Sequence, residues 1–302
     1  MDNLIGKRLD GRYQIESLVG MGGMANVYRG TDTRTGNAIA VKVLKEEFLD
    51  NEELVRRFKN ESKAISILNH PNIVKVYDVS VTDRLQYIVM EYVEGITLKT
   101  YIEKKGQLNY KEALSIAIQV SRGIQAAHAK HIIHRDIKPA NIMVSPKGYF
   151  KLGDFGVARQ QISGTMTVIG SYDFMAPEVY KGMPYNQTAD IYSLGMVLYY
   201  LANDFKLPFS EIQSSIDRIN RRMNEDTEWE WKHKLPIWGL TTNIKNKMSE
   251  EILYDTVMTA CANDPKARYQ SATAMKRDLI ICMDKICTLE KRKDNWEAAK
   301  KK

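Results

Sequence analysis

One short stretch of the sequence concentrates side chains that could do chemistry. HIIHRDIKPANIMV, residues 131–144, places Arg135, Asp136, Lys138 and Asn141 between two apolar runs. Asp136 could accept a proton from a substrate hydroxyl if the stretch is a catalytic loop. A solvated turn between two core elements also explains the composition. The remaining motifs have to distinguish these two interpretations.

A second acidic group follows a strand-like segment. Asp154 begins the tripeptide DFG directly after KLG and offers the hard carboxylate that typically holds magnesium. Asn141 lies five residues after Asp136 and adds a second oxygen ligand. A lone tripeptide is common by chance, so its order relative to the other motifs carries the information.

A glycine cluster lies near the start of the chain, in LVGMGGMANVY (18–28). Gly20, Gly22 and Gly23 would let the backbone approach a ligand and point N–H groups at phosphate oxygens. An ordinary hairpin turn is the alternative. A Rossmann site would need a helix here, whereas a strand-like segment follows, and the sequence contains no GxxxxGK[ST] motif.

A lysine interrupts an apolar strand in AIAVK. Lys42 lies between Val41 and Val43, and lysine is rarely buried without a partner. It could extend to solvent from an edge strand. Alternatively, Glu61 on the next predicted helix could hold the ammonium group, which would then position nucleotide phosphates.

The elements that must position these groups change in character along the chain. Alternating and β-branched patterns predict strands over 13–19, 26–32, 38–44, 73–81 and 86–93. Helical spacing of apolar residues predicts helices over 52–69, 98–106 and 110–131, and mostly helix from 189 to 287. A small β-rich part therefore precedes a larger helical part, with a boundary near 92–96.

Composition limits the class of protein. The 302 residues are 44% hydrophobic, which is enough for a substantial core, and the net charge of +7 does not by itself indicate nucleic-acid binding. The three cysteines form no CxxC pair, so a disulfide framework or zinc site is not expected and a reducing cytosol is. The N-terminus is too polar for a signal peptide. The apolar run 191–201 is too short to span a membrane and predicts a buried helix.

Together, the motifs resemble the eukaryotic-like protein kinases, specifically the bacterial Ser/Thr kinases. The matching residues, in chain order, are GMGGMANV at 20–27, AVK at 40–42, Glu61, HRDIKPAN at 134–141, DFG at 154–156, APE at 176–178, DIYSLG at 190–195 and Arg268 in DPKARYQ. The resemblance covers nearly the whole chain, residues 5–285. Their shared order and spacing favour the catalytic-loop interpretation of 131–144.

The resemblance implies an α+β, bilobal protein-kinase fold. It divides the chain into a small β-rich N-lobe with one long helix (1–94), a larger, mostly helical C-lobe (95–285) and a basic polar tail (286–302). The implied activity is transfer of the γ-phosphate of ATP to Ser/Thr hydroxyls of proteins, with Mg²⁺, or Mn²⁺, as the metal.

The same resemblance assigns roles to the polar residues. Asp136 orients and deprotonates the substrate hydroxyl, and Lys138 lies near the transferred phosphate. Asn141 and Asp154 hold the metal. Lys42, paired with Glu61, holds the α- and β-phosphates.

Further positions have implied roles in nucleotide binding and in joining the lobes. The glycine loop at Gly20, Gly22 and Gly23 covers the phosphates. The adenine pocket comprises Val27, Ala40, Met143, the guarding Met90 and the hinge Glu91 to Val93. The stack between the lobes is Ile65, Val76, Phe155 and His134. A buried ion pair joins Glu178 to Arg268 and anchors the substrate-binding segment.

The segment before Glu178 contains candidate phosphorylation sites. Thr167 lies eleven residues before Glu178, where similar kinases carry their activating phosphothreonine, and Thr165 is a second candidate. The resemblance places Arg57, Arg135 and Arg159 around the phosphate. Autophosphorylation would require transient self-association.

The tail and the setting follow less directly. Residues 285–302 carry seven Lys/Arg and three Asp/Glu, which predicts a solvated helix or frayed end, or weak contact with an anionic membrane surface. The expected location is cytoplasmic, either as a soluble kinase or as the cytosolic part of a membrane-anchored receptor kinase. Protein substrates, and no nucleic acid, are the expected partners.

Three departures from the family pattern stand out. Ala25 replaces the third glycine, the 154–178 segment is short, and 203–250 matches poorly. That last segment contains Trp229, Trp231 and Trp238, which are either core residues or a partner surface. A pseudokinase that binds without catalysis and a small-molecule kinase of related fold remain alternatives at this point.

Overall fold

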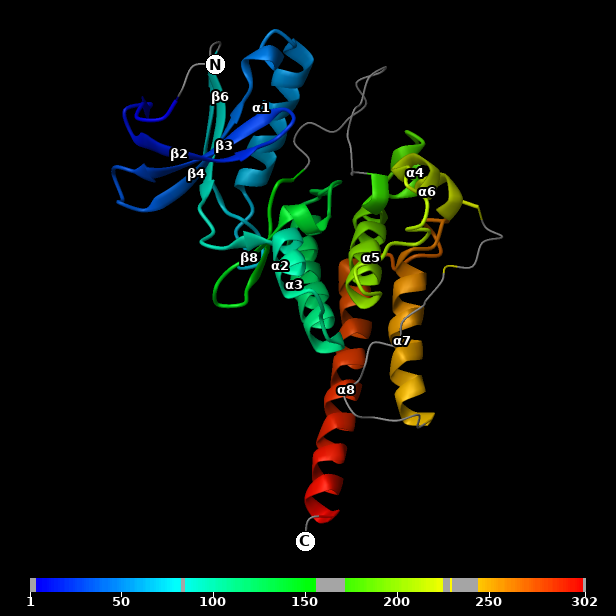
Figure 1. Ribbon diagram of the computed structural model, residues 1–302. Helices are drawn as coiled ribbons and strands as arrows, with labels where there is room; N and C mark the ends of the chain where they lie inside the picture. Colours follow the sequence, from blue (N-terminus) through cyan, green and yellow to red (C-terminus); the bar gives the residue numbers. More distant parts are fainter. Residues whose placement is uncertain (1–3, 83–84, 156–171, 225–228, 230–243, 301–302) are drawn as a thin grey trace.

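The computed structural model divides the chain into a β-rich lobe and a helical lobe (Figure 1). The structure describes residues 4–82, 85–155, 172–224, 229 and 244–300. The N-terminal residues lie in the β-rich lobe, and the last helix ends far from it, below the helical lobe in Figure 1.

The N-lobe is built on an antiparallel sheet of six strands. Their order in the sheet is β1-β2-β3-β4-β6-β5. Their bounds are Arg8–Leu9 (β1), Tyr13–Met21 (β2), Ala25–Asp32 (β3), Ala38–Leu44 (β4), Val76–Thr82 (β5) and Leu85–Glu91 (β6). One sheet face buries a separate cluster that includes Tyr13, Ile39 and Tyr87. Alternation along β2, β3 and β4 produced this face, as the period-2 pattern predicts.

One long helix, α1 (Glu52–Ser66), packs beside β5 in the N-lobe. The side chain of Asn51 caps it by accepting the N–H of Leu54 at 3.0 Å. Leu54, Phe58 and Ile65 form its buried face and belong to the larger core that continues into the C-lobe. The helix ends at Ser66, three residues before the predicted end at 69.

A small sheet joins the lobes. It contains β7 (Ile96–Thr97), β8 (Ile142–Val144) and β9 (Phe150–Leu152), and Ile73 of the N-lobe forms a parallel bridge to Leu152. Gly95 permits the close approach of β7 to β8, because a Cβ there would lie 2.0 Å from the carbonyl oxygen of Val144. This pairing fixes β8, the strand that follows the 134–141 loop, beside β7 just after the connection between the lobes.

The C-lobe is helical. Its helices are α2 (Leu98–Lys105), α3 (Tyr110–His128), α4 (Pro177–Tyr180), α5 (Thr188–Ala202), α6 (Ser215–Arg222), α7 (Ile244–Ala260) and α8 (Ala272–Lys300). The short 3₁₀ helices are η1 (Glu46–Phe48) in the N-lobe, and η2 (Pro139–Asn141) and η3 (Tyr172–Phe174) in the C-lobe. α3 packs against α5 and α8, and α5 also packs against α7. α5 is buried at almost every position, which confirms the buried helix predicted for 191–201.

Two uncertain segments now have partial answers. Trp229 is buried and its ring lies edge-on to Tyr199 with 5.7 Å between centroids, so the core interpretation holds for this residue. Trp231 and Trp238 lie outside the described residues. α8 runs without interruption through residue 285 to Lys300, and its last part extends past the other helices (Figure 1). No helix of the described chain is both long and apolar enough to cross a bilayer.

Candidate active site

A buried carboxylate holds the backbone of the 134–141 loop. Asp190, in the first turn of α5, accepts the N–H groups of His134 and Arg135, both at 2.8 Å. His128, at the end of α3, lies 2.7 Å from the same carboxylate. Burial acts to raise the pKa of Asp190. The hydrogen bond and charge of His128 and the backbone N–H of His134 outweigh this effect and lower the pKa below its usual value, so the carboxylate stays ionised.

This anchor fixes Asp136 and the groups around it. Lys138 lies 3.0 Å from Asp136 Oδ2, and Asn141 Nδ2 donates to the same oxygen at 2.8 Å. Asn141 Nδ2 also donates to the backbone carbonyl of Asp136 at 2.8 Å. Arg135 has a φ of 70°, a left-handed conformation that costs a non-glycine residue about 1–3 kcal/mol. The surrounding hydrogen bonds therefore hold the Asp136 carboxylate in one orientation.

A neutral histidine connects this loop to the DFG segment. His134 is buried, and burial lowers its pKa. Its Nδ1 accepts the N–H of Asp136 at 3.2 Å, and its Nε2 lies 2.9 Å from the carbonyl of Gly153, to which it donates. The ring also contacts that of Phe155, with 4.4 Å between centroids and a tilt of 41°, which is one contact of the expected stack between the lobes. One imidazole thus positions both Asp136 and the residue before Asp154.

Asp154 and Lys42 form an ion pair between the two lobes. The Asp154 side chain is 50% exposed, and its backbone φ of 54° is also left-handed. Desolvation acts to raise its pKa, but the charge and hydrogen bond of Lys42 outweigh this and lower it. The predicted Lys42–Glu61 pair stays a prediction, because the Glu61 side chain lies outside the described residues, although α1 carries the position.

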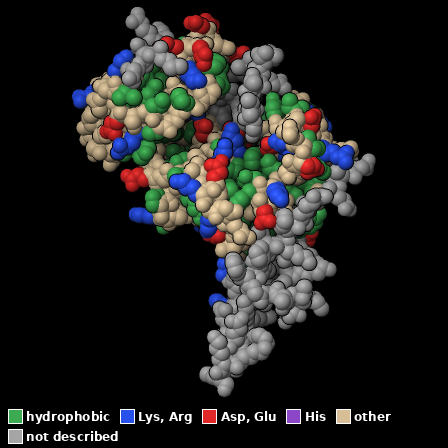
Figure 2. All heavy atoms as spheres, viewed as in Figure 1, with side chains coloured by type: hydrophobic (Ala, Val, Ile, Leu, Met, Phe, Trp, Pro, Cys, Tyr) green, Lys and Arg blue, Asp and Glu red, His purple; other side chains and the backbone are tan. Residues whose placement is uncertain are grey.

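The recess between the lobes has acidic and basic side chains along its edge (Figure 2). On the N-lobe side, Val27 pairs with Lys42 across β3 and β4, and Ala40 pairs with Met90 across β4 and β6. Ala40 is buried, whereas Val27, Met90 and, from β8, Met143 are partly buried. This register places Val27, Ala40, Met90 and Lys42 on adjoining strands of one sheet, whereas Met143 comes from β8 of the other sheet.

The glycine-rich turn connects β2 to β3. Gly22 donates its N–H to Ala25 O at 2.9 Å, and a Cβ at Gly22 would lie only 3.0 Å from that oxygen. Gly20 lies on β2, and a Cβ at Gly23 would meet no neighbour within 4 Å among the described atoms. The tight contact therefore favours glycine at 22, while a side chain at 23 would meet no described neighbour, so the backbone of Gly23 could be approached by a ligand. Ala25 starts β3 and is buried, so its methyl group points into the lobe.

The hinge, Glu91 to Val93, forms one ion pair to the C-lobe. The Glu91 carboxylate pairs with Lys151 of β9 at 2.8 Å and accepts the N–H of Lys75 at 3.2 Å. The side chain of Glu91 thus joins the lobes, and its backbone N–H donates to the carbonyl of Lys75 at 2.8 Å. Val93 is partly buried in the same connection.

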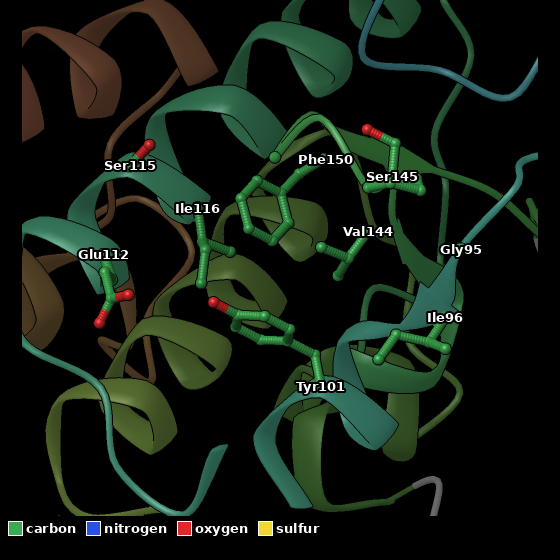
Figure 3. A pocket seen from close by; sticks show the side chains of 11 residues that line it. Gly95, Ile96, Tyr101, Glu112, Ser115, Ile116, Val144, Ser145 and Phe150 are labelled. Carbon is green, nitrogen blue, oxygen red and sulfur yellow. The ribbon is translucent and has the colours of Figure 1, made fainter. Parts of the chain in front are cut away.

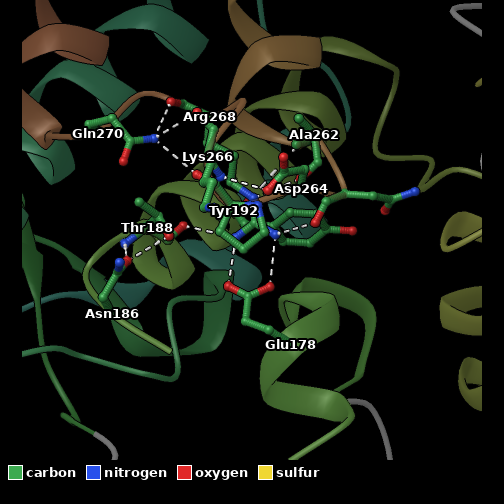
Figure 4. A network of polar contacts seen from close by, with 12 residues as sticks. Glu178, Asn186, Thr188, Tyr192, Ala262, Asp264, Lys266, Arg268 and Gln270 are labelled. Carbon is green, nitrogen blue, oxygen red and sulfur yellow. Dashed lines mark hydrogen bonds and ion pairs between the residues drawn. The ribbon is translucent and has the colours of Figure 1, made fainter. Parts of the chain in front are cut away.

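The ion pair between Glu178 and Arg268 anchors α4 (Figure 4). Arg268 Nη1 and Nη2 donate to the two carboxylate oxygens at 2.7 and 2.8 Å. Its guanidinium lies 4.8 Å from the ring centroid of Tyr192. It also donates to the carbonyls of Ala262 and Thr188, at 2.7 and 3.2 Å. Both charged side chains are buried, as the family resemblance implied.

The donors present suit a hard divalent cation. Because Asn141 Nδ2 is turned to Asp136, its Oδ1 is the atom that can face a metal, and the Asp154 carboxylate is ionised and half exposed. Within the described chain, no group of three or more His, Cys, Asp or Glu side chains could hold a metal. Two oxygen ligands plus substrate phosphates and waters match the ligand set of Mg²⁺.

A separate cavity of about 520 Å³ lies in the C-lobe, and Ile96 of β7 is one of its lining residues (Figure 3). Tyr101, Glu112, Ile116 and Phe150 are among its lining residues, and none of the predicted site residues lines it. It is therefore distinct from the predicted nucleotide site at Lys42 and Asp154.

The sequence missed several groups that shape the site. No sequence motif pointed to His128 or Lys151, and Asp190 matched the family only as part of the DIYSLG stretch. A lone aspartate in an apolar helix was a usable signal, because a buried carboxylate requires partners. Thr165, Thr167, Arg159 and the side chain of Arg57 lie outside the described residues.

Comparison with known proteins was consistent with this geometry. Residues 13–280 match the model of the protein kinase domain. A probable serine/threonine-protein kinase of Clostridium perfringens, CPE1738, is 41% identical over 91% of this chain. The serine/threonine-protein kinase PrkC of Bacillus subtilis is 39% identical over 96% of it. The chain spans 39% and 43% of the lengths of these two relatives. The crystal structure of the Mycobacterium tuberculosis PknI kinase domain superposes with a TM-score of 0.70 at 23% identity, covering 93% of this chain and 100% of that domain.

Proposed function

This chain belongs to the protein kinase domain family, and we propose that it transfers the γ-phosphate of ATP to serine and threonine hydroxyls of proteins. The observation that carries the proposal is the constellation of Asp136, Lys138 and Asn141 opposite the Lys42–Asp154 pair. Phosphoryl transfer depends mainly on positioning and charge neutralisation, and these residues provide fixed charges of both signs.

In this mechanism Asp136 accepts the proton of the attacking hydroxyl while Lys138 lies beside the transferred phosphate. Lys138 and Asn141 both contact Asp136 Oδ2 and so orient the carboxylate. When bound, the divalent cation would neutralise phosphate charge, and Asn141 and Asp154 would hold it. We propose Mg²⁺ as this cation, with Mn²⁺ as an alternative.

Nucleotide binding would exchange partners within the Lys42–Asp154 pair. Lys42 would turn to the α- and β-phosphates and Asp154 to the cation, so each group keeps an opposite charge. The Gly22–Gly23 turn would cover the phosphates, and adenine would lie between Val27, Ala40 and Met143 near the main chain of Glu91 to Val93.

The direct test is incubation of the protein with labelled ATP, Mg²⁺ and a generic protein substrate. We expect label on serine and threonine of the substrate, and no label when the cation is removed with EDTA. ATP binding without transfer would instead support the pseudokinase alternative. Transfer only to small hydroxyl compounds would support the small-molecule kinase.

Replacing Lys42 by methionine should slow transfer by about 10²- to 10³-fold, the loss typical of removing one preorganised charge donor. Single-turnover rates at saturating ATP would measure this effect. Lys45→Met is the matched control, because Lys45 lies just after β4 and its ammonium is 3.9 Å from Glu47. Equal rates in the Lys42→Met and wild-type proteins would remove Lys42 from the mechanism.

We also propose that Thr167 is an autophosphorylation site, with Thr165 as a second one. A phosphate there would carry about −1.5 to −2 charges and needs cations. Arg135 is a suitable cation, because it adjoins Asp136 and its guanidinium lies 5.7 Å from the ring centroid of Tyr185, which follows α4 in the chain. Thr167→Ala should lower initial rates about tenfold or more, because charge-assisted hydrogen bonds that order the loop are lost.

Mass spectrometry should find phosphate on Thr167 of the wild-type protein and none on Asp136→Asn protein made alone. Mixing the two proteins tests transient self-association, because transfer between copies would label Thr167 of the inactive one. A Thr167→Ala enzyme as fast as wild type would exclude this regulatory role.

We further propose that the chain functions in the cytoplasm and that its tail contacts anionic membrane surfaces weakly. The described cysteines are free, which suits a reducing compartment, and residues 285–302 carry seven basic and three acidic residues. Each basic residue near such a surface contributes about 1 kcal/mol. Protein truncated after Thr288 keeps the buried Ile286 and should sediment less with phosphatidylserine vesicles than the intact chain. Neutral vesicles are the control, and equal sedimentation of both proteins would rule out the contact.

A further inference from the structure

Two arginines of α6 clamp the short helix η3, and no motif of the sequence pointed to them. Arg218 Nε and Nη2 donate to the two carboxylate oxygens of Asp173 at 2.7 and 2.8 Å. Arg222 donates to the backbone carbonyls of Asp173 and Tyr172 at 2.7 and 2.9 Å. A side-chain fork and a main-chain fork therefore hold the same three-residue helix.

The clamp is largely shielded from water. Arg222 is fully buried, and only 7% of Asp173 is exposed. Arg218 Nη1 donates in addition to the carbonyls of Ile212 and Gln213, at 2.5 and 2.8 Å, which ties the clamp to the loop before α6. Bidentate contacts in such surroundings fix both distance and orientation.

Residues 172–178, which begin with η3, have two further contacts that hold them. At their far end, Arg268 holds Glu178 of α4. Within η3, Phe174 lies edge-on to Tyr200 of α5, with 6.0 Å between ring centroids. α5 also carries Asp190, which holds the 134–141 loop. Residues 172–178 and the loop that carries Asp136 thus both contact α5. At the η3 end, the only described charged contacts of residues 172–178 come from α6.

We infer that Arg218 and Arg222 position residues 172–178 for binding of the protein substrate, so that α6 controls affinity for the protein and not for ATP. This inference rests on the proposed kinase function. The two arginines act through the 172–178 segment and are positioning residues. The nucleotide groups Lys42 and Asp154 lie on other elements, β4 and the segment after β9, which α6 does not contact through any described hydrogen bond.

The test compares Arg218→Met with Arg221→Met. Arg221 is the matched control, because it is exposed on the same helix and its guanidinium lies 5.9 Å from the Phe209 ring, away from η3. In Arg218→Met, KM for a generic protein substrate should rise about tenfold while KM for ATP stays unchanged, and Arg221→Met should match wild type. Arg218→Lys keeps the charge but not the fork, and should give an intermediate KM.

Hydrogen exchange provides a readout that does not depend on activity. The amides of 172–178 should exchange faster in Arg218→Met than in Arg221→Met, while those of α5 stay protected. Unchanged exchange in 172–178, or parallel rises in both KM values, would overturn the inference. A wild-type protein that transfers no phosphate to any protein would overturn the proposed function, and the exchange comparison would still decide whether the clamp orders this segment.

Discussion

The Asp136→Asn protein should lose phosphoryl transfer by about 10²- to 10⁴-fold, the contribution typical of a positioned general base. Asparagine keeps the size of the side chain and can still contact Lys138, but it cannot accept the hydroxyl proton. Asp136 lies on the 134–141 loop, whereas Lys42 and the glycine turn of the N-lobe supply the expected nucleotide contacts. ATP affinity should therefore change little.

Two measurements separate these effects. Single-turnover transfer to a protein substrate reports the chemical step, and equilibrium binding of a fluorescent ATP analogue reports affinity. Asp255→Asn is the matched control, because Asp255 is exposed on α7. Wild-type turnover in the Asp136→Asn protein would refute the assigned role, and loss of ATP binding would show that Asp136 acts on the nucleotide site instead.

Replacing Arg268 by alanine should lower the free energy of unfolding by about 3–5 kcal/mol, the usual cost of removing one partner of a buried ion pair. The Glu178 carboxylate would remain buried without its counter-charge. The carbonyls of Ala262, Thr188 and Asn263 would lose a donor at the same time. Because domains are typically stable by only about 5–15 kcal/mol, much of the protein would unfold at modest temperature.

Urea unfolding followed by circular dichroism would measure the change. Arg277→Ala is the control, because the Arg277 side chain is 74% exposed and exposed ion pairs contribute about 0–1 kcal/mol. The double variant Arg268→Met, Glu178→Leu should lose less unfolding free energy than the two single variants lose together, because no uncompensated charge stays buried. Additive losses would contradict the pair as the source of the effect.

The sequence by itself determined the elements and the local chemistry. Strand alternation placed β2, β3 and β4 within two residues of their observed bounds, and helical spacing predicted α1, α2 and α3. The Asp136, Lys138 and Asn141 contacts lie within six consecutive residues, 136–141, so a single loop conformation brings them together. Short-range spacing of this kind is visible in a sequence because few chain conformations can realise it.

Only the tertiary structure decided which distant groups meet. Lys42 pairs with Asp154, which lies 112 residues away, and Arg218 pairs with Asp173 across 45 residues. The family resemblance anticipated one such contact, Glu178 with Arg268, because both residues matched known motifs. It could not anticipate Asp173 with Arg218, which no matching motif includes.

The backbone contacts were also hidden from the sequence. Asp190 recognises main-chain N–H groups of the 134–141 loop, and every non-proline residue carries such a group. The left-handed φ values of Arg135 and Asp154 were likewise not visible in the sequence, because only a few per cent of non-glycine residues adopt that region. The sequence therefore determined which residues could do the chemistry, and the packing of α5 against the loop decided where they stand, because long-range contacts depend on the path of the whole chain.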